Sequence, residues 1–97
     1  MKNIKQIEKK LKTLEIILKE KFKVKRIGLF GSFIKGEQEK KSDIDILVEF
    51  SEVPGFFDFI ELEDFLAEKL EIKVDLVMKD VLKPRIKDVV LKEVVYI

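Results

Sequence analysis

Two aspartates separated by one residue open an apolar segment, and no other feature constrains the fold as much. Asp43 and Asp45 alternate with isoleucine in the run DIDILV. Branched apolar residues favour a β-strand, in which alternate side chains share a face. Both carboxylates therefore point the same way, with Cα atoms roughly 7 Å apart. Apart from its acids this strand is mostly apolar, so we expect it to be central in the sheet and buried on both faces.

The chemistry of these neighbouring carboxylates predicts a metal ion. Carboxylates side by side resist ionising together, and a divalent cation removes that conflict. Mg²⁺ favours carboxylate oxygens combined with substrate phosphates.

A small-residue pair, Gly31-Ser32, precedes the aspartates with ten residues between. Gly31 would let a phosphate approach the backbone closely, and the start of a short helix at Ser32 would attract it. A serine N-cap is also common without any ligand, so the pair gains its meaning from the aspartates that follow. Together they predict a metal–nucleotide site.

A third aspartate, Asp75, interrupts another apolar run, VDLV. If its strand lies beside the strand of Asp43 and Asp45, the three carboxylates form one cluster that a metal ion would stabilise. The alternative is that Asp75 faces solvent through simple strand alternation. With the first two aspartates present, we favour the metal cluster. Lys35 could face phosphate or solvent, and for Arg85 the sequence does not choose between the nucleotide and solvent.

The composition narrows the possible chemistry. The 97 residues include no cysteine and no histidine, which excludes thiolate nucleophiles, disulfides and zinc sites built from those residues. A net charge of +1 argues against a dedicated polyanion binder. The N-terminus lacks an apolar signal region, and no apolar run is long enough to span a bilayer. We therefore expect a cytoplasmic protein without strong nucleic-acid binding.

The remaining pattern predicts one domain over residues 1–97, of the α+β class, with a small mixed β-sheet flanked by helices. Apolar residues at three- and four-residue steps predict a helix over 3–21, with Asn3 as its N-cap. The other expected elements are a strand over 24–30, a helical turn over 32–36, a loop over 37–42, a strand over 43–50, a helix over 55–70, a strand over 72–78, a helix over 79–93 and a short strand over 94–97.

The surface and core assignments follow from the same pattern. We interpret Phe56, Phe57, Phe59 and Phe65 as core residues rather than as a stack for a ligand ring. The lysines between residues 9 and 25 are expected to form a solvated face. The apolar residues at the C-terminal end fit either an interface or the core.

The segment GSFIKGEQEKKSDIDILVEF and the later KVDLV resemble the signature of the DNA polymerase β-like nucleotidyltransferase superfamily. That signature is Gly-Ser, ten residues, Asp-x-Asp and a third aspartate on a neighbouring strand. Within the superfamily the chain is similar, over nearly its whole length, to the minimal nucleotidyltransferase antitoxins encoded beside HEPN-domain toxins.

The resemblance implies specific residue roles. By resemblance, Gly31 and Ser32 contact the nucleotide phosphates. The acids Asp43, Asp45 and Asp75 hold two Mg²⁺ ions and carry the catalysis. Family members often have arginine where this chain has Lys35, which would keep the charge but lose bidentate phosphate binding.

The resemblance also implies a reaction and a partner. The reaction is transfer of AMP from ATP to a hydroxyl, typically a tyrosine, of the partner HEPN-domain toxin, which silences the toxin. Two alternatives stay open: an antitoxin that only binds and occludes the toxin, and a nucleotidyltransferase acting on RNA ends or small molecules. The near-neutral charge disfavours the last. A homo-oligomer and a complex with the toxin are both compatible with the sequence.

Overall fold

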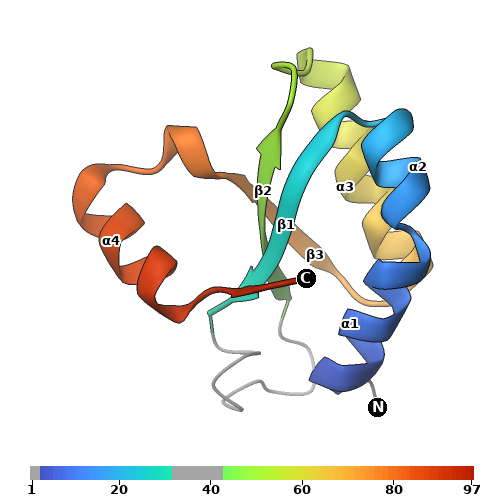
Figure 1. Cartoon of the computed structure of the whole chain (residues 1–97), viewed down its shortest axis with the longest axis horizontal. Coiled ribbons are helices and arrows are strands. Elements are labelled where there is room, and N and C mark those ends of the chain that lie inside the picture. The colour runs from blue at the N-terminus through green and yellow to red at the C-terminus, as the bar shows by residue number, and fades with distance from the viewer. Residues whose placement is uncertain (1–2, 32–42) are drawn as a thin grey trace.

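A computed structural model of the chain describes residues 3–31 and 43–97. The predicted helical turn over 32–36 and the predicted loop over 37–42 lie outside these residues. The described elements are α1 (Ile4–Thr13), α2 (Glu15–Glu20), β1 (Val24–Phe30), β2 (Ile44–Phe50), α3 (Phe56–Leu70), β3 (Val74–Met78), the 3-10 helix η1 (Lys79–Val81), α4 (Pro84–Glu93) and β4 (Val95–Tyr96) (Figure 1).

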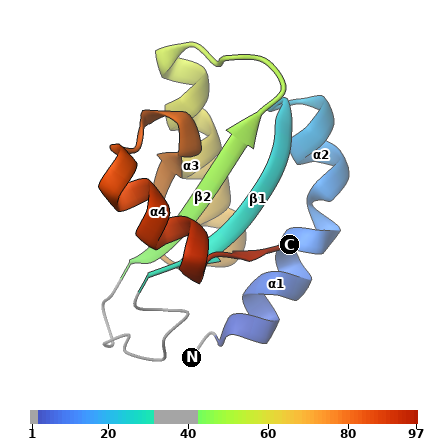
Figure 2. The same cartoon turned by 60° about the vertical axis from the view of Figure 1, so that its left-hand side comes forward.

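The four strands form one mixed sheet, as predicted. Their order is β3-β2-β1-β4, with β1 antiparallel to both of its neighbours and β2 parallel to β3. Parallel neighbours need a crossover, which α3 supplies between β2 and β3. Helices α1, α2 and α3 cover one face of the sheet, and α4 lies over the other (Figures 1 and 2). The sheet therefore has two faces with different coverings.

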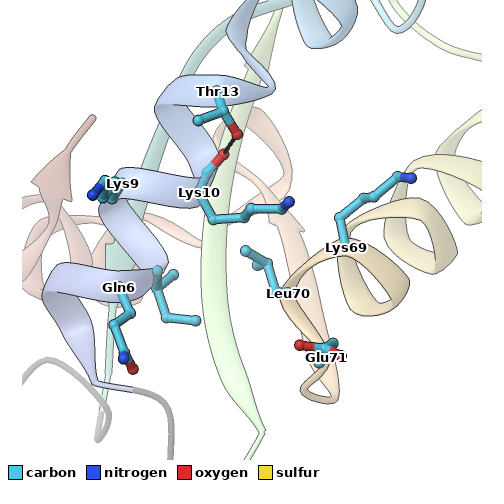
Figure 3. Close-up of a pocket in the computed structure, with 8 residues that line it drawn as sticks. Gln6, Lys9, Lys10, Thr13, Lys69, Leu70 and Glu71 are labelled. Atoms are coloured by element: carbon cyan, nitrogen blue, oxygen red, sulfur yellow. Dashed lines mark hydrogen bonds between the residues drawn. The ribbon is translucent and has the colours of Figure 1, made fainter.

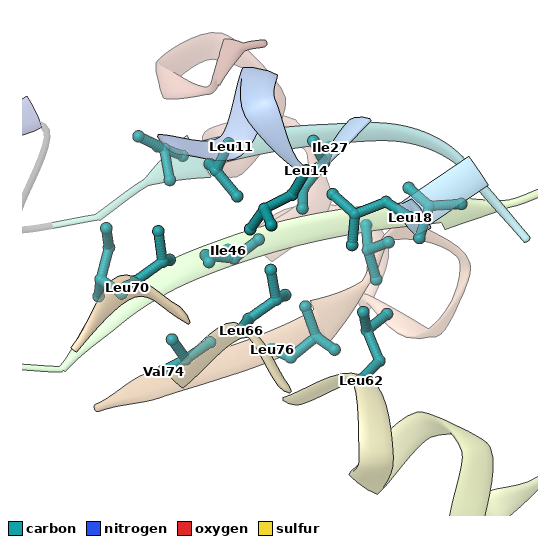
Figure 4. Close-up of a cluster of buried hydrophobic side chains, with 14 of the residues drawn as sticks. Leu11, Leu14, Leu18, Ile27, Ile46, Leu62, Leu66, Leu70, Val74 and Leu76 are labelled. Atoms are coloured by element: carbon teal, nitrogen blue, oxygen red, sulfur yellow. The ribbon is translucent and has the colours of Figure 1, made fainter. Parts of the chain in front are cut away.

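The main hydrophobic core lies between the sheet and helices α1 to α3. Alternate residues of the strands, such as Ile46 and Leu76, meet leucines spaced by three or four residues on the helices (Figure 4). Leu62, Leu66 and Leu70 of α3 are almost fully buried. Each such side chain stabilises the fold by about 2 kcal/mol. Most of the stability therefore resides on this face of the sheet.

The opposite face of the sheet is covered only thinly among the described residues. Leu47 of β2 is buried there, and α4 buries a single residue, Val90. Gly28 pairs with Leu47 in the sheet, and a Cβ on it would lie 2.6 Å from Cγ2 of Val94. Glycine at this position therefore lets the chain that follows α4 pack directly on β1.

The predicted helix over 3–21 is two helices. Asn3 caps α1 as expected: its Oδ1 accepts from the Gln6 backbone N–H at 2.9 Å, and the Gln6 side chain accepts in return from the Asn3 N–H. The break follows Thr13, whose hydroxyl donates to the Lys10 carbonyl at 2.6 Å and competes with the helix ladder. Leu14, between the helices, turns into the core.

The assignment of four phenylalanines to the core is wrong for two of them. Phe59 and Phe65 pack against the core, but Phe56 is 73% exposed and Phe57 is 81% exposed. The ring of Phe59 contacts that of Phe50, the last residue of β2, with centroids 6.4 Å apart. The first turn of α3 lies beyond the end of the sheet, so Phe56 stays largely exposed (Figure 1).

The C-terminal predictions hold with shifted boundaries. The expected helix over 79–93 is η1 followed by α4, because Pro84 fits only the first turn of a helix. A short terminal strand forms at β4. The helices in residues 3–31 and 43–97 are all too short or too polar to span a lipid bilayer.

Candidate active site

Two of the three predicted aspartates are register partners in the sheet. Asp45 of β2 and Asp75 of β3 stand opposite each other in the parallel pair, and Ile44 N–H fixes this register by donating to Lys73 O at 2.9 Å. Partners on neighbouring strands point to the same face, with strands about 4.8 Å apart. Asp43 lies two residues before Asp45, directly before β2. The structure thus brings the acids to one corner of the sheet.

The environment of these aspartates is partly open to solvent. Asp43 and Asp45 are half-buried, and Asp75 is exposed. Burial raises the pKa of the Asp45 carboxyl above its ordinary value, and the charges of Asp75 and Asp43 and a side-chain hydrogen bond with Asp75 raise that pKa further. Asp75 and Asp43 therefore disfavour the ionised form of Asp45. A bound cation would offset this repulsion.

The donor set fits a divalent ion, although the acids are not gathered around one point. No group of three or more acidic side chains in the described ranges is already arranged to hold a metal ion. The carboxylates nevertheless supply only oxygen ligands, from adjacent strands, on a face that solvent reaches at Asp75. Convergence on one ion would require changes of side-chain rotamer, while Asp45 and Asp75 keep their register.

Gly31 brings the backbone directly against the side chain of Asp45. Its φ is +81°, a conformation that side chains strongly disfavour, and a Cβ at this position would overlap Oδ2 of Asp45. Glycine is therefore required for both reasons. The Gly-Ser corner predicted from the sequence begins beside the aspartates. Ser32 and Lys35 lie outside the described residues, and Arg85 is exposed near the start of α4.

A charged network on the same face was not anticipated from the sequence. Glu49, four residues after Asp45 on β2, pairs with Lys79 of η1 at 3.5 Å and with Arg26 of β1 at 4.0 Å. The Arg26 guanidinium lies 3.7 Å above the ring of Tyr96. Strand alternation could have placed Glu49 on this face, but its cationic partners depend on the tertiary fold. The network ties the chain leading into α4 to the sheet.

Two surface pockets lie away from the aspartates. One, of about 380 Å³, lies between α1 and α3, with Lys9, Lys10 and Lys69 among its lining residues (Figure 3). The other, of about 470 Å³, lies between the first two helices and β1, with Lys12 and Lys19 among its lining residues. Neither pocket contains a residue of the predicted site, so we interpret Lys9, Lys10, Lys12 and Lys19 as part of the solvated face expected from the sequence.

The mixed sheet, the paired aspartates and the glycine corner are compatible with the fold of a nucleotidyltransferase. The sequence matches the Nucleotidyltransferase domain family over residues 4–97. The chain belongs to this family, and the resemblance seen in its sequence is confirmed.

Two similar proteins are named as protein adenylyltransferases, a narrower class than nucleotidyltransferases. The chain is 47% identical to protein adenylyltransferase MntA of Thermococcus cleftensis, over all of this chain and 98% of that one. It is 51% identical, over the full length of both chains, to a Methanocaldococcus jannaschii protein named provisionally as protein adenylyltransferase MJ0128.

A similar solved structure, a toxin-antitoxin with AMP-PNP, has a TM-score of 0.73 and 31% identity, over 92% of this chain and 70% of that one. In another, from Shewanella oneidensis, a tri-AMPylated HEPN toxin is in complex with its MNT antitoxin; the TM-score is 0.66 and the identity 25%, over 93% and 70% of the two chains.

Proposed function

We propose that this chain is a Mg²⁺-dependent protein adenylyltransferase that transfers AMP from ATP to a tyrosine hydroxyl of a HEPN-domain toxin and thereby acts as its antitoxin. The observation that carries the proposal is the register of Asp45 with Asp75, beside the glycine corner at Gly31. The names of the relatives supply the reaction, and the solved complexes supply the kind of partner.

The aspartates and the Gly-Ser pair would have different roles in the reaction. Asp43, Asp45 and Asp75 would hold the Mg²⁺, which when bound neutralises charge on the triphosphate and the leaving group. The backbone at Gly31 would leave room for the phosphates, and Ser32 would contact them. Positioning and charge neutralisation then supply most of the rate acceleration, as in related phosphoryl transfers.

Bond changes in the transfer are simple. The acceptor oxygen forms a bond to the α-phosphorus of ATP, the bond from that phosphorus to the bridging oxygen breaks, and pyrophosphate leaves with the electron pair. The acceptor proton needs a base, and the chain has no histidine. Asp75, the most exposed of the three acids, is the candidate that can reach an incoming hydroxyl.

The direct test is transfer of label from α-labelled ATP to the toxin encoded beside this protein, in the presence of Mg²⁺. We expect labelled toxin with the wild type and a loss of about 100-fold or more in Asp45→Asn. Asp88→Asn is the matched control, since Asp88 is an exposed aspartate of α4 outside the cluster. Equal labelling by wild type and Asp45→Asn would refute the proposed catalytic role.

The same variant separates catalysis from occlusion. If Asp45→Asn neutralises the toxin fully without labelling it, the protein acts by binding alone. If label passes to RNA and none to the toxin, the acceptor class is wrong.

A further inference from the structure

The first turn of α3 and the loop before it form an apolar surface that the fold itself does not use. Val53 is 90% exposed, Phe56 73%, Phe57 81% and Ile60 37%. We call these four residues the Phe56–Phe57 patch. The two rings contact each other edge to face, with centroids 5.4 Å apart. Ile60 follows them by three and four residues, so it lies on the same side of the helix.

Packing within the chain does not explain the patch. Phe59, Leu62 and Leu66 are among the residues by which α3 contacts the core. The first turn of α3, which carries both exposed rings, lies beyond the end of β2 (Figure 1). Exposed apolar side chains gathered in one place mark interaction surfaces more often than scattered ones do. Phenylalanine is also enriched at the centres of protein interfaces.

The charges around the patch indicate what covers it. Glu52, Asp58 and Glu61 are each adjacent in sequence to a residue of the patch and are all exposed. Glu61 forms an ion pair with Lys21 at 3.3 Å, whereas the charges of Glu52 and Asp58 add to an acidic margin. Two copies of this chain meeting patch to patch would bring these acids against one another, which is unfavourable. An apolar pocket with a basic rim on a different protein satisfies both the rings and the acids.

The patch and the aspartates lie at opposite ends of β2. Asp45 is near the start of the strand, whereas the patch follows its last residue, Phe50, roughly 16 Å further along the strand. In Figure 1 the first turn of α3 lies at one end of the sheet and the start of β2 at the other. A protein bound at the patch therefore leaves the acidic cluster open to nucleotide and acceptor.

We propose that the Phe56–Phe57 patch is a docking surface for the toxin, separate from the catalytic corner, which holds the partner through a basic-rimmed apolar pocket. This inference rests on the proposed function for the identity of the partner. It adds that affinity for the toxin and transfer of AMP depend on different residues.

The test measures toxin affinity by calorimetry without ATP, for the wild type and for Phe56→Ala/Phe57→Ala. Both side chains are exposed, so the variant should fold. We expect a Kd higher by about 30-fold or more. The matched control is Val89→Ala, an exposed apolar residue of α4 on the other face of the sheet, for which we expect a change of less than about threefold. At saturating toxin, the double variant should transfer label at the wild-type rate.

Several results would overturn the docking surface: an unchanged Kd in the double variant, an equal loss in Val89→Ala, or no binding of toxin by the wild type. A change in the sedimentation of the isolated chain on mutating the patch would show that a second copy covers it, and would also overturn the proposal. Binding is measured without ATP, so the two proposals can fail separately. If the wild type binds the toxin but transfers no label, and the double variant binds the toxin more weakly, the proposed reaction is refuted and the docking surface is supported.

Discussion

Gly31 is the residue at which backbone conformation and site chemistry coincide. A side chain would be strained by the φ of +81° and would also displace the carboxylate of Asp45. We expect Gly31→Ala to lower the free energy of unfolding by about 2 kcal/mol or more, and Tm by about 8 °C or more. Calorimetry would measure both changes.

Gly55→Ala is the control for Gly31→Ala. Gly55 has a φ of −70°, which any residue adopts, and an added Cβ would meet only the flexible side chain of Asp58 at 3.3 Å. We expect this change to cost at most about 1 kcal/mol. Equal destabilisation by the two substitutions would contradict the strain argument.

The ionised carboxylate of Asp45 lowers the stability of the folded protein. The pKa of Asp45 is raised by burial and then by Asp75 and Asp43. The folded protein therefore holds this proton more tightly than the unfolded chain does, and the contribution of Asp45 to stability falls as pH rises above the ordinary aspartate pKa. At pH 7 without Mg²⁺, Asp45→Asn should raise the free energy of unfolding by about 0.5 kcal/mol.

The measurement is chemical denaturation of the wild type and Asp45→Asn at pH 7 and at pH 4. The advantage of the variant should shrink at the lower pH, because the wild-type carboxyl is then protonated more often. A variant less stable than the wild type at pH 7 would show that the carboxylate makes a net favourable contact.

Among the elements, the strands follow from local pattern, whereas their pairing does not. Alternation placed Asp43 and Asp45 on one face, and the structure agrees with the predicted strand over 24–30 residue for residue. That β3 lies beside β2 depends on the α3 crossover, which no pattern around Asp75 reveals. From the sequence, the pairing of Asp45 with Asp75 could therefore be predicted only on the assumption that their strands are neighbours.

Errors at the element scale have physical causes of the same kind. Helical spacing put Phe56 on the inner side of α3, but spacing does not tell where the underlying sheet ends. The helix breaks at Leu14 because the Thr13 hydroxyl donates to the Lys10 carbonyl. The spacing of apolar residues does not reveal whether such a hydroxyl bonds to the backbone or to water. The Glu49 network joins β1, β2 and η1, which are distant in sequence. Each of these features depends on contacts that form only in the tertiary structure.

The link between η1 and the sheet can be tested at Glu49, which pairs with Lys79 and Arg26. The side chain of Glu49 is only 17% exposed, so Glu49→Ala removes a largely buried partner from both cations. We expect a loss of about 1 kcal/mol and faster amide hydrogen exchange in η1 and the start of α4. Asp88→Ala, on the exposed side of α4, should leave exchange in this segment unchanged. Equal exchange in Glu49→Ala and wild type would show that the pairs do not hold η1.

On the scale of the whole molecule, the main hydrophobic core and the proposed catalytic site lie on opposite faces of one sheet. The leucines of α1 to α3 form the core on one face, while the aspartates lie on the thinly covered face with α4. A well-packed face allows the other to keep mutually repelling carboxylates at its corner. This division lets a chain of 97 residues maintain a charged site without a large core.

The division predicts how the molecule responds to its metal. If Mg²⁺ binds the folded protein at Asp43, Asp45 and Asp75, stability rises with its concentration, by about 2.7 kcal/mol at one hundred times Kd. For a domain of this size that corresponds to a rise in Tm of about 10 °C or more.

NaCl at matched ionic strength controls for screening of charges by salt. Because the ion relieves repulsion specific to this corner, Asp45→Asn and Asp75→Asn should lose most of the Mg²⁺ effect while Asp88→Asn keeps it. A Tm that rises equally in all four proteins would place the ion elsewhere on the surface.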